Sequence, residues 1–316
     1  MTFNDTMVFN VGPSQIEVAY QQIGDASAPT VLLIQGLGTQ LLGWPDGFCK
    51  LLVEHGLHLI RFDNRDVGRS THFTNAPAPD FSAVLRGDHS SVSYTLSDMA
   101  ADAVGLLDVL GIDSAHVVGV SMGGAIAQTM AIEYPARVRS LVSMMSTTGD
   151  TKVGQSHPEV SKQLFSGPPP RTRQEVIDRH LKALSVIGSP GFPIDREEVA
   201  ERVGRAFDRR YDPAGIARQA IASLASKDRT PHLNRLDVHT LVVHGCEDAM
   251  CDCSGGRATA AAIHNSQLLL MDGLGHNLPS GAWPAITGHI AALVRLTESR
   301  IASRGEKPGP GLGSSV

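Results

Sequence analysis

The amino-acid sequence predicts an α/β protein: a mostly parallel, twisted sheet with helices on both faces and one helical insertion. Three observations predict this class. Short segments that are apolar at every position, such as residues 31–34, suit strands buried on both faces. Helical patterns alternate with these segments, which is typical of parallel strands joined by crossover helices. A chain of 316 residues with 42% hydrophobic residues is also long enough to bury a large core.

The first half of the chain supplies most of the predicted sheet. Strands are expected at 7–11, 15–22, 31–34, 57–62, 115–119 and 137–144. Helices are expected at 45–55, 97–110 and 122–133, and in the second of these the apolar residues fall on one stripe. Gly56 and Gly111 end the first two helices. Residues 73–93 are rich in Pro, Asp and Ser and are expected to form an excursion on the surface.

The alternation is interrupted between residues 149 and 236. That stretch has helical patterns around 174–187 and 195–207 and no convincing strand, and Arg209 and Arg210 are expected on a solvated helix face. Afterwards, strands are expected at 240–244 and 267–271 and a closing helix at 283–298. We therefore predict an α/β core of residues 1–148 and 237–302, a helical cap insertion at 149–236 and a flexible tail at 303–316.

Composition and charge limit the partners and the location. The net charge of −5 gives no general attraction for nucleic acid. No apolar segment approaches the roughly 20 residues of a membrane-spanning helix, so no integral membrane segment is expected. The N-terminus lacks the features of a signal peptide, and four cysteines cannot form a disulfide framework, so a cytoplasmic protein is expected. The sequence leaves the oligomeric state open.

Two kinds of cofactor site are disfavoured by their spacing. Cys246, Cys251 and Cys253 lack C-x-x-C pairs, so no metal is expected there. The glycines at 36 and 38 match neither dinucleotide-binding nor phosphate-loop patterns. We therefore expect no cofactor.

A candidate nucleophile lies between a strand and a helix. Residues 119–123 read Gly-Val-Ser-Met-Gly, a G-x-S-x-G motif preceded by an apolar strand and followed by a helix. The glycines allow the tight turn that exposes the Ser121 hydroxyl at the carboxyl end of the sheet. A plain strand–turn–helix with a capping serine is the alternative.

A serine hydroxyl needs a base, and the base needs an orienting acid. Among the 13 histidines, His276 follows the strand at 267–271, and loops of this kind carry the chemistry of α/β sheets. His116 and His244 lie in apolar strands and are expected to be structural. Asp248 follows the strand at 240–244 and is the expected acid, with Glu247 as the alternative.

The transition state of such a reaction carries an oxyanion, which backbone amides stabilise. The expected donors are the N–H groups of Met122 and Leu37. The glycines at 36 and 38 would expose the second amide, although they could simply turn the chain. Asp63 lies in a charged loop and is expected to bond that loop.

Together these residues resemble the α/β-hydrolase superfamily in order and spacing over most of the chain. Residues 42–46 and 61–71 look like the branch that contains aclacinomycin methylesterase and related bacterial esterases and lipases. The resemblance implies an α/β-hydrolase fold and hydrolysis of small-molecule carboxylic esters by a triad of Ser121, Asp248 and His276. The chain departs from the common pattern at Gln35, where many members have His, and at Asp66, where many have Gly.

Several activities share this triad. A carbon–carbon bond hydrolase, a thioesterase and a cofactor-free haloperoxidase therefore remain alternatives to an esterase. A non-catalytic binding module on the same fold is a further alternative, which a complete triad disfavours.

Overall fold

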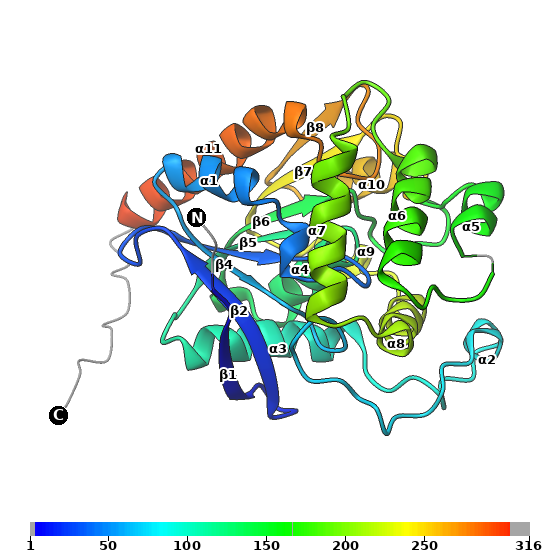
Figure 1. Ribbon diagram of the computed structural model, residues 1–316. Helices are drawn as coiled ribbons and strands as arrows, with labels where there is room; N and C mark the ends of the chain where they lie inside the picture. The colour runs from blue at the N-terminus through cyan, green and yellow to red at the C-terminus, as the bar shows by residue number, and fades with distance from the viewer. Residues whose placement is uncertain (1–3, 166, 304–316) are drawn as a thin grey trace.

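The computed structural model describes residues 4–165 and 167–303, which form a sheet of eight strands with helices on both faces (Figure 1). The strand order is β1-β2-β4-β3-β5-β6-β7-β8. The strands are β1 (Thr6–Val11), β2 (Ile16–Ile23), β3 (Thr30–Ile34), β4 (His58–Phe62), β5 (Ala115–Val120), β6 (Val138–Met144), β7 (His239–Gly245) and β8 (Ser266–Met271). β2 runs antiparallel to both of its neighbours, and all other pairs are parallel.

The eight strands are those expected from the sequence. Every residue of β4 and β5 is buried, because helices cover both faces of the sheet at these strands. The parallel strands from β3 to β8 end at one edge of the sheet. The loops that follow β3, β5, β7 and β8 therefore meet there, as expected for a site at the carboxyl ends of the strands.

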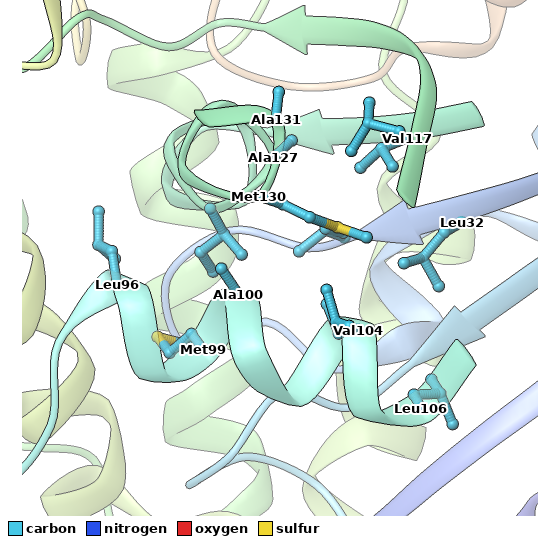
Figure 2. Packing of buried hydrophobic residues seen from close by; sticks show 14 of the residues in the cluster. Leu32, Leu96, Met99, Ala100, Val104, Leu106, Val117, Ala127, Met130 and Ala131 are labelled. Atoms are coloured by element: carbon cyan, nitrogen blue, oxygen red, sulfur yellow. The ribbon is translucent and has the colours of Figure 1, made fainter. Parts of the chain in front are cut away.

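Helices α3 (Leu96–Val109), α4 (Met122–Glu133) and α10 (Ser254–Ala262) cover one face. Figure 2 shows the Met130 side chain of α4 lying above Ala100 and Val104 of α3, on the side of the sheet residue Leu32. Thr95 begins α3 as one half of a reciprocal capping box with Asp98. Helices α1 (Asp46–Glu54) and α11 (Trp283–Ser303) cover the opposite face.

The end of the chain differs from the sequence prediction, because the closing helix, expected to end at residue 298, continues to residue 303. Ser303, expected as the first residue of a flexible tail, is the last residue of α11. The rest of the expected tail, 304–316, lies outside the described residues.

Five helices lie between β6 and β7 in the described part of 149–236, and no strand does. They are α5 (Pro158–Phe165), α6 (Arg173–Ile187), α7 (Arg196–Arg209), α8 (Pro213–Leu224) and α9 (Thr230–Leu233). Five helices were not predicted from the sequence: α5, α8, α9, α10 and, in the surface excursion, α2 (Phe81–Leu85). Three short 3-10 helices complete the described elements: η1 (Leu41–Gly43), η2 (Pro135–Arg137) and η3 (Ser280–Ala282).

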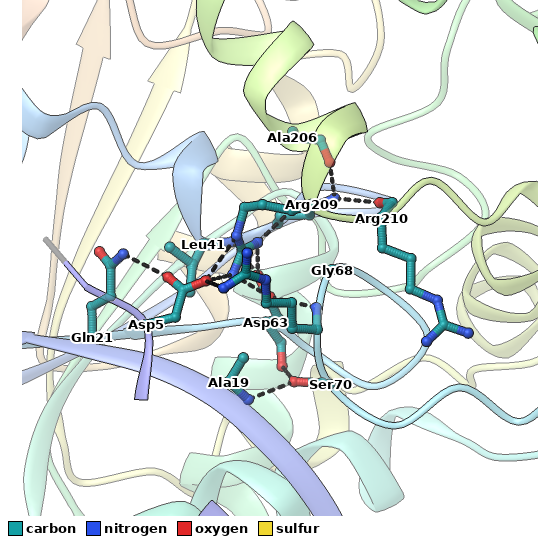
Figure 3. A network of polar contacts seen from close by, with 12 residues as sticks. Asp5, Ala19, Gln21, Leu41, Asp63, Gly68, Ser70, Ala206, Arg209 and Arg210 are labelled. Carbon is teal, nitrogen blue, oxygen red and sulfur yellow. Dashed lines mark hydrogen bonds and ion pairs between the residues drawn. The ribbon is translucent and has the colours of Figure 1, made fainter. Parts of the chain in front are cut away.

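Arg209 corrects one expectation, because its side chain is only 9% exposed and belongs to an ion-pair network and not to a solvated face (Figure 3). Its guanidinium lies 2.8 Å from both Asp5 and Asp63. Asp63 also accepts hydrogen bonds from the backbone N–H groups of Leu41 and Arg69, as expected for a carboxylate that bonds its own loop. Burial raises the pKa of Asp63, although Arg209 opposes this effect. The network joins α7 to the core.

Within the described chain, no helix is both long enough and apolar enough to span a bilayer.

Candidate active site

Ser121 lies on a strained turn between β5 and α4. Its backbone is left-handed at φ +56°, which is unusual for a residue other than glycine. The flanking glycines make the turn possible. A Cβ on Gly119 would lie 2.0 Å from the carbonyl oxygen of Gly123, and one on Gly123 would lie 2.2 Å from that of Ile34. The Ser121 N–H donates to the Met144 carbonyl, so β6 also holds the turn.

The structure brings Ser121, His276 and Asp248 together, although they come from three separate loops. His276 Nε2 lies 3.0 Å from Ser121 Oγ, and His276 Nδ1 lies 2.7 Å from Asp248 Oδ2. Because a carboxylate only accepts, we assign the ring proton to Nδ1, which leaves Nε2 free to accept from the Ser121 hydroxyl. The imidazole therefore bridges the serine and the acid.

Asp248 is an ionised and fully buried acceptor. Its Oδ1 accepts from the backbone N–H groups of Met250 and Cys251, at 2.9 and 2.8 Å. Burial by itself raises the pKa of Asp248, but His276 and the hydrogen bonds outweigh burial and lower it to about 2. The alternative acid, Glu247, instead accepts from the Gly273 N–H at 2.6 Å. Of the two acids, Asp248 is therefore the one bonded to the imidazole.

The turn after β3 lies against Ser121. A Cβ on Gly36 would be 3.1 Å from the Ser121 Cβ, a distance at which any side chain would crowd the serine. Neither Leu37 N–H nor Met122 N–H has a hydrogen-bond acceptor among residues 4–165 and 167–303. Both predicted oxyanion donors thus belong to segments beside Ser121, and neither amide is bonded to another described residue.

The loop that carries His276 is held by the chain just after α6. The His276 N–H donates to the Ile187 carbonyl at 2.6 Å. The Ser189 hydroxyl accepts from the Gly275 N–H at 2.9 Å and donates to Asn277 Oδ1 at 2.5 Å. Sequence reasoning did not identify Ser189, because no local motif indicates a contact across 86 residues.

His116 and His244 lie buried within the sheet, as expected for structural histidines. His116 bonds Ser140 at 2.8 Å and Glu298 at 3.0 Å, far from the loops that carry Ser121. His244 Nε2 donates to the Cys251 carbonyl at 2.8 Å and lies 3.5 Å from Asp248 Oδ2. His244 therefore contacts the acid and the loop after β7.

One group of side chains has the composition of a metal site within the described chain. Ligand atoms of Asp66, His72 and Asp212 lie within 4.8 Å of one another. Arg218, however, contacts Asp66 through two hydrogen bonds of 2.8 and 2.7 Å, and its positive charge disfavours a cation there. Asp66 has φ +68°, which explains why glycine suits this position in related sequences. The group is accounted for as an ion-pair network between α8 and the loop after β4.

Comparison with protein families decides the classification. The model of a family described as the alpha/beta hydrolase fold matches residues 29–280. The chain belongs to this family. The match confirms the predicted fold and the family resemblance, and this alpha/beta hydrolase is an enzyme.

Similar proteins include esterases and other hydrolases. Rhodomycin D methylesterase of Streptomyces peucetius is 27% identical over 299 residues, which cover 86% of this chain and 93% of that protein. The 2-hydroxy-6-oxononadienedioate/2-hydroxy-6-oxononatrienedioate hydrolase 2 of Pseudomonas putida is 27% identical over 273 residues, covering 84% and 87%. The solved structure of an esterase from Exiguobacterium antarcticum has a TM-score of 0.69 at 19% identity and covers 92% of this chain and 100% of that one. The first similarity supports the predicted branch, and the last shows the fold.

Proposed function

We propose that this alpha/beta hydrolase cleaves small or medium apolar carboxylic esters through an acyl-enzyme on Ser121. The observation that carries the proposal is the continuous chain of contacts from Ser121 Oγ to His276 and on to Asp248, at 3.0 and 2.7 Å. A serine, a histidine and a buried carboxylate in this order form an activated nucleophile.

The proposed reaction has two halves. Ser121 Oγ attacks the ester carbonyl while His276 Nε2 takes its proton, and the Leu37 and Met122 amides stabilise the oxyanion. His276 then returns the proton to the departing alcohol, and the acyl group stays on Ser121. In the second half, a water molecule gives a proton to His276 and attacks the acyl carbonyl. The bond between the acyl group and Ser121 Oγ then breaks, His276 returns the proton to Oγ, and the carboxylic acid is released. Asp248 holds the imidazole in the required tautomer throughout.

Two further predictions belong with this proposal. We infer that residues 149–236 act as a cap that shapes the substrate pocket, because α6 and α8 contact the loops beside Ser121. We also infer a cytoplasmic location, which fits four free cysteine thiols.

The test is turnover of p-nitrophenyl esters. Ser121→Ala and His276→Ala are expected to abolish turnover while thermal unfolding stays close to that of the parent. His289→Ala, which removes an exposed imidazole on α11, is the matched control and is expected to keep full activity. Turnover that persists in Ser121→Ala refutes the proposal. A fluorophosphonate probe should label the parent at Ser121, whereas a non-catalytic binding module would not react.

A substrate panel decides between activities that share the triad. The Streptomyces peucetius relative is named for a methylesterase, so methyl esters of bulky polycyclic acids belong in the panel together with esters of increasing chain length. The Pseudomonas putida relative favours a second candidate, cleavage of a carbon–carbon bond in a vinylogous diketone. Thioester and peracid assays cover the remaining alternatives. Preference for a methyl ester over the diketone is the expected result.

A further inference from the structure

The turn formed by residues 35–38, which we call the oxyanion turn, has two backbone N–H groups that bond side chains and one between them that does not. The Gly36 N–H donates to the side-chain oxygen of Gln35 at 3.1 Å, and the Gly38 N–H donates to that of Gln219 at 2.8 Å. Leu37, between them, has no acceptor for its N–H among the described residues. The two flanking amides are held by side chains, which leaves the Leu37 amide for a ligand.

Gln219 reaches the turn from α8 and is 0% exposed. Its amide nitrogen donates to the Arg65 carbonyl at 2.7 Å, so both ends of this side chain are bonded. Arg65 is itself fixed, because its guanidinium forms two hydrogen bonds of 2.6 and 2.7 Å with the buried Asp102. A buried amide with both ends bonded has one favoured orientation.

Helix α8, which carries Gln219, is held against the core by several contacts. Arg218, the preceding residue, pairs with the fully buried Asp66. A Cβ on Gly215 would lie 2.3 Å from the Asp66 carbonyl oxygen, so the helix backbone is in direct contact with the loop after β4. Ile216, one turn before Gln219, is the nearest side chain to Gly38. The helix therefore cannot shift without moving the oxyanion turn.

We propose that Gln219 is a positioning residue for the oxyanion turn, which fixes the direction of the Leu37 amide during ester hydrolysis; this inference rests on the proposed function. Gly38 has φ +66° and is free to adopt other backbone conformations when nothing holds it. The bond from Gln219 fixes the peptide plane next to Leu37. Oxyanion stabilisation depends on donors that already point at the developing charge, so this fixed orientation lowers the barrier.

The experiment compares two buried glutamines. Gln219→Met has a similar length but can neither accept from Gly38 nor donate to Arg65. We expect kcat to fall by about tenfold to a hundredfold, with KM within about twofold of the parent. An aryl trifluoromethyl ketone forms a tetrahedral oxyanion adduct with serine, and its affinity should fall by the same factor as kcat.

Gln128→Met is the matched control. Gln128 is also 0% exposed, and its side chain bonds Ser143 and Arg229 and no residue of the oxyanion turn. We expect it to lower unfolding stability in a similar way while kcat stays within about twofold of the parent. If Gln219→Met does not fold, Gln219→Leu replaces it with the same two measurements.

Each outcome supports or overturns the inference. A parallel fall of kcat and ketone affinity in the Gln219 variant, but not in Gln128→Met, supports it. Equal kcat in the two variants overturns it, as does an effect confined to KM. Failure of the proposed function looks different: the parent enzyme itself would then neither turn over esters nor be labelled at Ser121 by a fluorophosphonate.

Discussion

Replacing Asp248 by asparagine should disable the enzyme by reversing one hydrogen bond. Asp248 uses both oxygens as acceptors: Oδ1 takes the N–H groups of Met250 and Cys251, and Oδ2 takes Nδ1–H of His276. An asparagine has one oxygen and one NH₂ group. Two backbone donors hold the oxygen at the Oδ1 position, so the NH₂ group faces His276. The imidazole must then turn its unprotonated nitrogen towards residue 248.

The consequence is a histidine with its proton on the wrong nitrogen. With Nε2 protonated, His276 cannot accept the Ser121 proton, and kcat for p-nitrophenyl esters should fall by about 10⁴-fold. A pKa lowered from 3.8 to about 2 also corresponds to about 2 kcal/mol of folding free energy at pH 7. Because the folded pKa is depressed, this contribution is present above about pH 4 and is lost as the pH falls towards 2. The variant should therefore be less stable at pH 7, with the difference closing in acid.

Glu247→Gln is the control, since Glu247 bonds the backbone of Gly273 and not the imidazole. It should retain turnover within about threefold of the parent. Steady-state kinetics and urea unfolding at several pH values make both measurements. Turnover by Asp248→Asn within about tenfold of the parent would refute the reasoning about the tautomer. A larger loss of turnover in Glu247→Gln than in Asp248→Asn would show that Glu247 orients the imidazole instead.

Two predictions concern stability. Arg209→Ala leaves the fully buried Asp63 without its cation and should lower the free energy of unfolding by about 3 kcal/mol. Arg173→Ala, which removes an exposed ion pair, should lower it by less than about 1 kcal/mol. Urea titrations measure both values, and equal losses would contradict the prediction. The hydrogen bond from His116 lowers the pKa of Glu298 to about 2, so its contribution to stability should be lost between about pH 4.5 and pH 2. Glu298→Gln should make the melting temperature less dependent on pH over that interval. An unchanged pH dependence would show that the bond between His116 and Glu298 does not contribute to stability.

The strands and the chemistry-bearing loops were predictable because their signals are local. Strands β3 to β7 read as short apolar segments, and the Ser121 turn is specified by its own glycines. Once those strands are ordered, the positions of Asp248 and His276 follow from the loops after β7 and β8. The helix α10 was missed because two glycines stand in its first turn, it has no side-chain cap and no large apolar residue marks its buried face. The α8 start, by contrast, carried a usable signal, a capping Asp212 followed by proline.

Contacts distant in sequence were not predictable. Arg209 lies on a charged helix whose pattern resembles a solvated face, and only the fold shows that Asp5 and Asp63 lie opposite. Gln219 is a polar residue in an otherwise ordinary helix, and its partner Gly38 lies 181 residues away. Such pairs cannot be predicted from one sequence, because the residue types and spacing around each member are the same whether or not the other member lies nearby.

The bond between the His276 amide and the Ile187 carbonyl ties the loop that carries the imidazole to the end of α6. If the end of α6 lifted to admit a bulky molecule, this bond would break and the imidazole would lose its anchor. In such an open form His276 would no longer be positioned to act as a base, and an acyl group on Ser121 would not be hydrolysed. The position of the last turn of α6 would therefore influence the competence of His276 as a base, although the two lie 89 residues apart in the sequence.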